Sequence, residues 1–393
     1  MSVSKIVAGI AVGAAVVLGA TTALAAGGWT TVTAPPTGQD AQLYGVTTTS
    51  DSDAWAVGHS NAEPNGLDAK AVIDHWNGSA WSQDAAPSTG YSTNTLAAVS
   101  ASSTSDAWAV GYSEQSRGTF HPLGLHWNGT AWSVSTALAT ALAGQLAVGV
   151  ADISPTDAYA VGGHLGSAHT GLVAQWNGST WTRLTVPLPN NDNMLSDLDA
   201  ISAGSATDVW IVGTYLFEVN SSDYSEEDYS LHWNGSTWSI VPMPLNPGTN
   251  PNVGYAINAI KANSPTDVWA VGDEYNLTTN SSSTLIEHYN GTAWSIVTSP
   301  SPGTGADLTG VTTSNASNDV WAVGDYTQAG SSVAQTLTLN WNGTKWSTVA
   351  SPNGSTGSSV LLSVATTPGA SIIQAVGFTG SSQADNPLSL QNG

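Results

Sequence analysis

Short segments in which large and small apolar residues alternate recur along the chain about every 50 residues. In the segment 53–58, Trp55 and Val57 point to one side of an extended strand, and Ala54 and Ala56 point to the other. A strand that is apolar on both faces suits a sheet that is covered on both sides. Residues 26–393 show no helical periodicity, so the pattern predicts an all-β protein.

Each repeat predicts four strands joined by turns. In the copy 257–300 the strands are residues 257–260, 268–272, 285–289 and 294–297. A Ser-Pro-Thr-Asp turn precedes the second strand. Asn290-Gly291, which is typical of a two-residue type I′ hairpin, precedes the fourth. Pro300 ends the repeat, because proline cannot donate a hydrogen bond to a β-ladder.

All 17 tryptophans occupy three positions of this repeat. The second strand carries Trp55, Trp108, Trp210, Trp269 and Trp321, the third carries Trp76, Trp127, Trp176, Trp233 and Trp341, and the fourth carries Trp29, Trp81, Trp132, Trp181, Trp238, Trp294 and Trp346. Tyr159 and Tyr289 replace tryptophan in two copies. Because every tryptophan is at a repeat position, we interpret the set as core and not as stacking platforms for sugars.

The number of repeats predicts the number of sheets. The glycine that ends the second strand occurs at Gly58, Gly111, Gly162, Gly213, Gly272, Gly324 and Gly377. The seventh copy lacks a fourth strand, but joining Asn392-Gly393 to Trp29 through residues 27–28 restores the Asn-Gly-x-x-Trp spacing of the others. The sequence therefore predicts a seven-bladed β-propeller of four-stranded antiparallel blades, in which the N-terminal strand completes the C-terminal blade.

The DVWAVG and HWNGTxW segments resemble those of bacterial secreted seven-bladed β-propellers of the broad kelch and galactose-oxidase-like type. The resemblance covers residues 27–393 and implies the fold, but it implies little about the activity. The Asn-Gly-x-x-Trp element also looks like the Asp-box of sialidases and the tryptophan-docking motif of quinoprotein propellers, which we interpret as convergence on one hairpin. A sialidase uses three arginines, whereas this chain has only Arg117 and Arg183. Galactose oxidase builds its cofactor on a cysteine, and the chain has none.

Composition and the N-terminus narrow the class of partner. Asp+Glu number 28 and Lys+Arg only 6, and the six cations are scattered, so neither nucleic acid nor an anionic membrane surface is an expected partner. Lys5 precedes an apolar run, and Ala23-Leu24-Ala25 has the form of a signal-peptidase site. We expect residues 1–25 to be a signal peptide, with an uncleaved anchor as the alternative. The rest, 26–393, is then one secreted domain, without membrane insertion and expected to be a monomer.

Several repeated polar residues have a structural interpretation. An aspartate precedes the second strand at Asp53, Asp106, Asp157, Asp208, Asp267 and Asp319. We interpret these as bonding back to their turns, and not as a ring of cation ligands. The histidines before the hairpin, His75, His126, His232 and His288, share one repeat position and are interpreted likewise. The Asn-Gly-Ser/Thr tripeptides match glycosylation sequons, but the turn explains them without modification.

The residues that do not repeat follow the second and fourth strands, which places them at one end of the sheets because strands alternate in direction. They form predicted loops at 59–70, 112–121, 163–170, 214–230, 273–284 and 325–335. Variable loops on a rigid scaffold usually carry recognition. The candidate ligand-binding residues are His59, Tyr112, Arg117, His121, His164, Tyr215, Asp273 and Asp325. We expect Asp273 and Asp325 to converge near the central opening.

One predicted loop is rich in acids that would suit a calcium ion. These residues are Asp223, Glu226, Glu227 and Asp228, and a solvated acidic loop is the alternative. No other cofactor is expected.

Two hypotheses for function follow. The chain has no G-x-S-x-G, H-E-x-x-H or phosphate-cradling glycine motif. The leading hypothesis is a secreted, non-catalytic binding or scaffold propeller that recognises a glycan or a cell-surface protein. The alternative is a glycoside hydrolase or lyase with paired carboxylates on the same face. Two carboxyl groups with separated pKa values in a central pocket would favour the enzyme.

Overall fold

The computed structural model describes residues 28–35, 39–61, 68–116, 118–163, 171–189, 196–220, 223–244, 253–314, 318–354, 357–367, 370–381 and 384–393. These residues form β-strands and one short helix, so the predicted all-β class is confirmed. The predicted signal peptide, 1–25, lies outside the described residues. No helix within the described ranges has the length and apolar character needed to cross a membrane.

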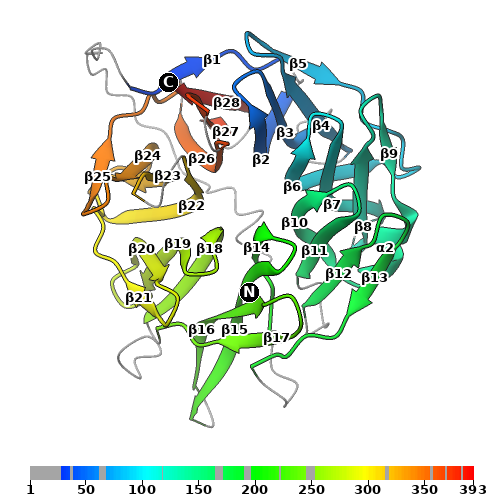
Figure 1. Cartoon of the computed structure of the whole chain (residues 1–393). Coiled ribbons are helices and arrows are strands. Elements are labelled where there is room, and N and C mark those ends of the chain that lie inside the picture. Colours follow the sequence, from blue (N-terminus) through cyan, green and yellow to red (C-terminus); the bar gives the residue numbers. More distant parts are fainter. Residues whose placement is uncertain are drawn as a thin grey trace.

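The strands form antiparallel sheets arranged around a common centre (Figure 1). The first strands, nearest the centre, are β2 (Gln39–Ser50), β6 (Thr93–Ser103), β10 (Leu146–Ser154), β14 (Ala200–Ser205), β18 (Val253–Ser264), β22 (Gly305–Thr313) and β26 (Ser358–Ala365). The second strands are β3 (Asp53–Asn61), β7 (Asp106–Ser116), β11 (Asp157–Gly163), β15 (Asp208–Asn220), β19 (Asp267–Asn276), β23 (Val320–Thr327) and β27 (Ile373–Ser381).

The outer half of each sheet contains the third and fourth strands. The third strands are β4 (Ala69–Trp76), β8 (Thr119–Trp127), β12 (Leu172–Trp176), β16 (Asp223–Trp233), β20 (Ser281–Tyr289), β24 (Ala334–Trp341) and β28 (Ala384–Asn392). The fourth strands are β5 (Trp81–Asp84), β9 (Trp132–Val134), β13 (Trp181–Leu184), β17 (Trp238–Val241), β21 (Trp294–Ile296), β25 (Trp346–Val349) and β1 (Thr30–Val32).

Two details of the topology bear on how the sheets are counted. Five sheets have four strands each, and one has eight. The eight-stranded sheet is joined by one parallel residue pair, Ser282 with Gly305, so β18–β21 and β22–β25 are two antiparallel units. The sheet β1-β28-β27-β26 contains both the N-terminal and the C-terminal strand. In it Thr30 pairs with Gln391, and Val32 pairs with Ser389.

Tryptophans pack neighbouring sheets against one another. Trp55 of β3 is fully buried, and its ring centroid lies 5.0 Å from that of Trp127 and 5.1 Å from that of Trp132, both in the next sheet. The same contact recurs from Trp269 to Trp341 and Trp346, at 5.3 and 5.5 Å. The interpretation of the tryptophans as core is therefore confirmed for these positions. Aromatic contacts of this kind stabilise an interface beyond the area that they bury.

The glycine that ends each second strand is required by close packing. A Cβ at Gly272 would lie 1.8 Å from the carbonyl oxygen of Ala256, and one at Gly58 would lie 1.9 Å from that of Gln42. The neighbouring first strand has a register shift at this level, between Ile257 and Ala259 in β18. No other residue has room there, which explains why the glycine repeats.

The structure differs from the sequence prediction in three places. The strands are longer, so that β15 and β16 form a hairpin where a loop was predicted at 214–230. Polar residues there continue the ladder because backbone pairing does not depend on side-chain polarity. A helix, α2 (Thr136–Ala141), was not predicted. The Ser135 side chain caps its N-terminus, and Leu138 is buried.

The third difference concerns the Asn-Gly turns. Trp76 pairs directly with Trp81, so the connection has four residues, 77–80, and not two. Gly78 has a φ of 92°, but Asn77 is not among the residues with positive φ, as a type I′ turn would require. The Asn77 side chain instead accepts hydrogen bonds from the backbone N–H groups of Ser79 and Ala80, both at 3.0 Å. Side-chain capping explains why asparagine repeats at this position.

Candidate functional site at the long-loop end

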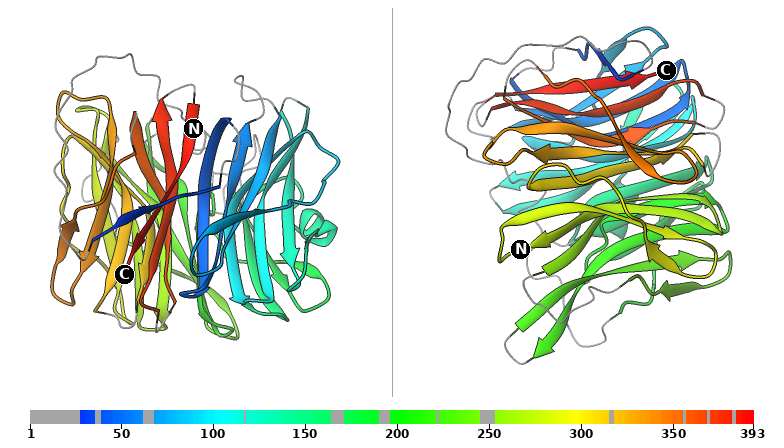
Figure 2. Two further views of the ribbon diagram at one scale, coloured as in Figure 1. Left: turned by 90° about the horizontal axis from the view of Figure 1, so that it is seen from above. Right: turned by 90° about the vertical axis from the view of Figure 1, so that its left-hand side faces the viewer.

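The strands run between two ends of the molecule (Figure 2). We call the end that carries the Asn-Gly turns the turn end. The opposite end, where second strands lead into third strands, is the long-loop end. Both ends contain clusters of acidic residues, and their surroundings separate structural acids from candidate functional ones.

At the turn end the repeated aspartates hold the third strand. Asp53 Oδ1 lies 2.7 Å from His75 Nε2, and the other three Asp–His pairs have distances of 2.7 or 2.8 Å. These other pairs are Asp106 with His126, Asp208 with His232 and Asp267 with His288. In the two copies without histidine, Asp157 accepts from Gln175 and Asp319 from Asn340. The structural interpretation holds: the aspartates bond to the third strand and also back toward the preceding turn, as Ser102 with Asp106 and Asn263 with Asp267 show.

Each of these histidines also stacks on the buried tryptophan of the second strand. The His75 and Trp55 ring centroids lie 4.1 Å apart, and those of His232 and Trp210 lie 4.0 Å apart. Ser102 donates a hydrogen bond to Asp106 and not to His126, so the hydroxyl is not placed as a nucleophile activated by histidine. The Asp–His pairs are packing devices and not catalytic dyads.

Two of the aspartates at the turn end, Asp267 and Asp53, are favoured in the charged form. Burial raises the pKa of Asp267, but hydrogen bonds from His288 and Asn263 outweigh burial, and the net pKa lies below the ordinary value. The pKa of Asp53 is also lowered, because hydrogen bonds from His75 and Thr49 outweigh the effect of burial, which raises it. A carboxylate stabilised in this way contributes to the stability of the fold.

At the long-loop end, aromatic and histidine side chains pair in ways that do not repeat. The ring centroids of Tyr44 and His59 lie 5.4 Å apart in a stacked arrangement, and those of Tyr91 and His121 lie 4.9 Å apart. Tyr112 contacts Phe120 edge-on at 5.6 Å. These contacts lie in the sheets β2–β5 and β6–β9, which are neighbours in the ring of Figure 1. The predicted residues His59, Tyr112 and His121 are therefore in adjacent sheets.

His59 is held in a tyrosine-rich environment. Burial lowers the pKa of the His59 imidazole, with the charge of Asp40 opposing it. The Tyr44 hydroxyl donates to Gln42 Oε1 at 2.7 Å, and Gln42 donates to Asp385 of the adjacent sheet at 2.5 Å. The imidazole is thus favoured in its neutral form, in which it both donates and accepts hydrogen bonds.

Acidic side chains gather at the same end in the sheets that contain β16, β19 and β23. Burial, with a smaller contribution from the charge of Asp273, raises the pKa of Asp325 to about 7. Asp228 is 3% exposed and accepts a hydrogen bond from the backbone N–H of Ile257 at 3.2 Å. Burial raises its pKa well above the ordinary value, and Asp199, Glu227 and Asp273 add to the effect. Asp325 and Asp228 are thus destabilised in the charged form, opposite to Asp53 and Asp267 at the turn end.

The remaining candidate residues are only partly described. Arg117 and His164 lie outside the described residues, and only the backbones of Asp223 and Glu226 are described, in β16. Tyr215 packs against Tyr229 at 5.9 Å between ring centroids. Glu227 and Asp228 are successive strand residues and point to opposite faces of β16, which disfavours a shared calcium ion. Within the described ranges, no group of three or more His, Asp or Glu residues is placed to hold a metal ion.

A channel with a volume of about 470 Å³ runs between the first strands. Four of its lining residues titrate: Tyr44, Asp152, Asp199 and Lys261. Asp273 and Asp325 are not among its lining residues. Asp152 and Lys261 were not predicted to be site residues, because both lie within repeated strands and not in variable loops.

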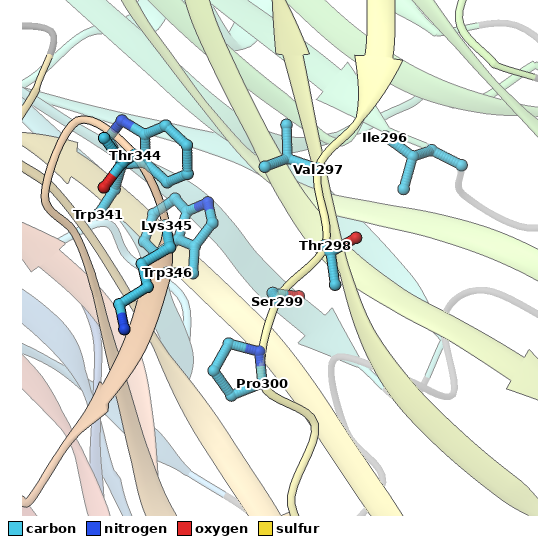
Figure 3. Close-up of a pocket in the computed structure, with 9 residues that line it drawn as sticks. All are labelled: Ile296, Val297, Thr298, Ser299, Pro300, Trp341, Thr344, Lys345 and Trp346. Carbon is cyan, nitrogen blue, oxygen red and sulfur yellow. The ribbon is translucent and has the colours of Figure 1, made fainter.

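A second hollow, of about 580 Å³, is a shallow groove on the outer rim. Residues 296–300 form one side of it, and Trp341, Lys345 and Trp346 form the other (Figure 3). The Trp341 and Trp346 ring centroids lie 6.0 Å apart, and Trp346 is only 4% exposed. The tryptophans are part of the repeated core, which leaves little aromatic surface for a ligand in the groove.

Solved structures with the same fold were found, whereas no family model and no curated protein matches the sequence. YCF48 bound to D1 peptide is 14% identical, with a TM-score of 0.54, over 94% of this chain and 96% of that one. A PL25 ulvan lyase bound to -[GlcA(1-4)Rha3S]- is 9% identical, with a TM-score of 0.54, over 92% and 93% of the two chains. The polysaccharide lyase Uly1 is 11% identical, with a TM-score of 0.56, over 92% and 91%. At these identities the likeness shows a β-propeller with repeated four-stranded blades and nothing further.

Proposed function

We propose that the chain is a secreted, seven-bladed propeller that binds a glycan or a cell-surface partner at its long-loop end without catalysing a reaction. In this proposal the eight-stranded sheet counts as two blades, and the pairing of β1 with β28 closes the ring. Export would remove residues 1–25.

The observation that carries the proposal is the unequal distribution of side chains between the two ends. The turn end repeats the same Asp–His pairs and Asn-Gly turns in most sheets, so it offers little that could specify a partner. The long-loop end carries tyrosine, phenylalanine, histidine and carboxyl groups that differ from sheet to sheet. Amphipathic aromatic rings beside a few convergent polar groups are the usual equipment of a ligand site.

Charge narrows the class of ligand. The chain has a formal net charge of −22 at pH 7, with 28 acidic and only 6 basic side chains. Like charges across an interface disfavour binding. We therefore propose a neutral glycan or a basic protein surface in preference to a polyanionic saccharide.

A glycan array probed with residues 26–393 tests the proposal, with each hit monitored for cleavage. We expect binding of neutral glycans without cleavage, weakened by Tyr91→Ala or by Tyr112→Ala. Asn290→Ala in a turn at the opposite end is the matched control and should bind as the wild type does. Binding lost in the turn variant but kept in both tyrosine variants would show that the wrong end has been chosen.

The second candidate is a polysaccharide lyase or glycoside hydrolase. The observation that favours it is the coupling of Asp273 with Asp325, whose pKa of about 7 would let a carboxyl group act as an acid or a base near neutral pH. Two of the solved structures with the same fold are polysaccharide lyases. Turnover of any array hit, abolished by Asp325→Asn while binding persists, would decide for the enzyme.

A further inference from the structure

Lys261 occupies a position where the other sheets carry small neutral residues. It pairs with Trp269 across β18 and β19. In each other sheet, the first-strand residue equivalent to Lys261 pairs with the aromatic residue of the second strand, or with Gln374 where that aromatic residue is missing. These equivalent residues are Thr47, Ser100, Ala151, Ser202, Thr312 and Ala365. Lys261 and these six residues all line the central channel. Lys261 is therefore the single cationic residue in a ring of seven equivalent residues, and the other six side chains end in a hydroxyl or a methyl group.

The hydroxyl groups of this ring connect adjacent sheets. Ser100 Oγ accepts a hydrogen bond from the backbone N–H of Asp152 at 2.9 Å, and Ser202 Oγ accepts from that of Ala262 at 3.0 Å. An ammonium group has no lone pair, so Lys261 cannot accept such a bond from the next sheet. Replacing a hydroxyl by lysine therefore removes a contact between sheets.

The Lys261 side chain is half-buried in the wall of the channel. Burial alone lowers its pKa, and no neighbouring carboxylate opposes the effect. Asp199 lies three residues before Ser202, the position equivalent to Lys261, so its backbone is about 10 Å away along the channel, and its carboxyl group accepts a hydrogen bond from Thr214. Asp152 lies one position beyond the ring in another sheet, where burial, with Asp106 adding, raises its pKa to about 8 and favours the neutral form. Neither acid is placed to neutralise Lys261, and a buried charge without a counter-charge is costly.

We propose that the central channel is a binding site for a small monovalent anion, a halide or a carboxylate, held by the Lys261 ammonium and the hydroxyl groups of Ser202 and Thr312 in the flanking sheets. A monovalent anion matches the single cation, and hydroxyl groups can donate to it. The site is independent of the proposed ligand site at the long-loop end. Its consequence would be an anion-dependent stability of the ring centre, because a ligand that binds only the folded state stabilises it.

Iodide provides a direct probe. Crystals of residues 26–393 soaked in sodium iodide should show an anomalous peak beside Lys261 Nζ. In solution, the melting temperature should rise when sodium chloride or sodium acetate replaces a salt of equal ionic strength with an anion too bulky for the channel. Lys345→Thr, at the outer groove, is the matched control and should retain both effects.

Lys261→Thr is the informative variant, because it installs the residue that neighbouring sheets already use and should fold. We expect it to lose both the iodide peak and the difference between the anions, and to melt at or above the wild-type temperature in the bulky-anion salt. An iodide-free channel in the wild type, or an equal response to chloride in the variant, would overturn the proposal. Because the probe is a simple anion, failure here leaves the glycan array result unaffected.

Discussion

Asp267 and Asp325, which lie at opposite ends of the molecule, are held in opposite electrostatic environments. At the turn end, Asp267 receives hydrogen bonds from His288 and Asn263, and its pKa lies below the ordinary value although burial raises it. At the long-loop end, burial and Asp273 raise the pKa of Asp325 to about 7. The same residue type thus stabilises the fold at one end and is held at a cost at the other. An unfavourable arrangement that persists in a folded protein is a candidate for function.

The aromatic residues divide in the same way. All tryptophans are at repeat positions, whereas only Tyr159 and Tyr289 of the 11 tyrosines are. Tryptophan fills the interfaces between sheets, as Trp55 and Trp127 illustrate. Tyrosine adds a hydroxyl group that forms hydrogen bonds, as Tyr44 does with Gln42 at the long-loop end. Four changes to the protein test this difference between the two ends.

The largest effect should come from removing the strand that both ends depend on. Deleting residues 26–35 removes β1 and Trp29, which is 5% exposed and packs edge-on against Trp321 at 5.6 Å between ring centroids. We expect a loss of at least about 3–5 kcal/mol of stability, together with aggregation through the exposed edge of β28. Thermal melting and light scattering measure both. Unchanged melting and solubility would contradict closure of the ring by β1.

The next largest effect concerns the turn end. Asp267→Ala leaves His288 without its acceptor and should lower the free energy of unfolding by roughly 1–3 kcal/mol. Ligand binding should not change, because the residue lies at the end without variable side chains. Chemical denaturation and the glycan array measure the two quantities on one preparation. A variant that keeps its stability but loses binding would reverse the assignment of the ends.

The pH dependence of stability should separate the ends further. A raised folded-state pKa means that the contribution of Asp325 is fully present below the unfolded pKa, near 4, and is lost as pH rises toward 7. Asp325→Asn should therefore be more stable than the wild type at pH 8 by on the order of 1–2 kcal/mol, and the gap should shrink toward pH 4. For Asp267, whose pKa is lowered, the stabilisation is present above the unfolded pKa and lost only as pH falls through the folded value. Denaturation curves between pH 3 and 8 would show both trends, and a pH-independent gap for Asp325→Asn would refute its raised pKa.

The smallest effect should come from one hairpin. Asn128→Ala removes the side-chain acceptor for the N–H groups of Thr130 and Ala131, at 3.0 and 3.1 Å. We expect a loss of about 1 kcal/mol, because the turn is exposed and water can replace the bonds. Asn128→Asp keeps the acceptor and serves as the control. Equal destabilisation by both changes would mean that the amide N–H₂, and not the oxygen, is the important group.

The sequence predicted the repeated parts of this molecule well and the variable parts poorly. Periodic tryptophans and glycines identified the strands, because each repeated residue has one packing reason, such as the close approach of Gly272 to Ala256. The hairpin β15–β16 was mistaken for a loop, since strand pairing needs only backbone groups and leaves little mark on composition. The sequence predicted that Asp273 and Asp325 lie close together, and the charge of Asp273 does raise the pKa of Asp325, but the burial that raises this pKa most could not be read from the sequence. Lys261 could have been found by aligning the repeats with one another, because it is a lysine where the other copies have a small neutral residue.

The pairing of β1 with β28 has a consequence for biosynthesis. Thr30 Oγ1 donates to the carbonyl oxygen of Gln391, so a strand that is translated early pairs with one that lies 361 positions later in the sequence. The first strand must wait, unpaired, while hundreds of residues are added at about 5–20 per second. During that interval the sheet β26–β28 does not yet exist. Any chaperone that accompanies the nascent chain would have to shield the segment around Trp29 for longer than any other, and a circular permutant that starts between two intact sheets should depend on it least.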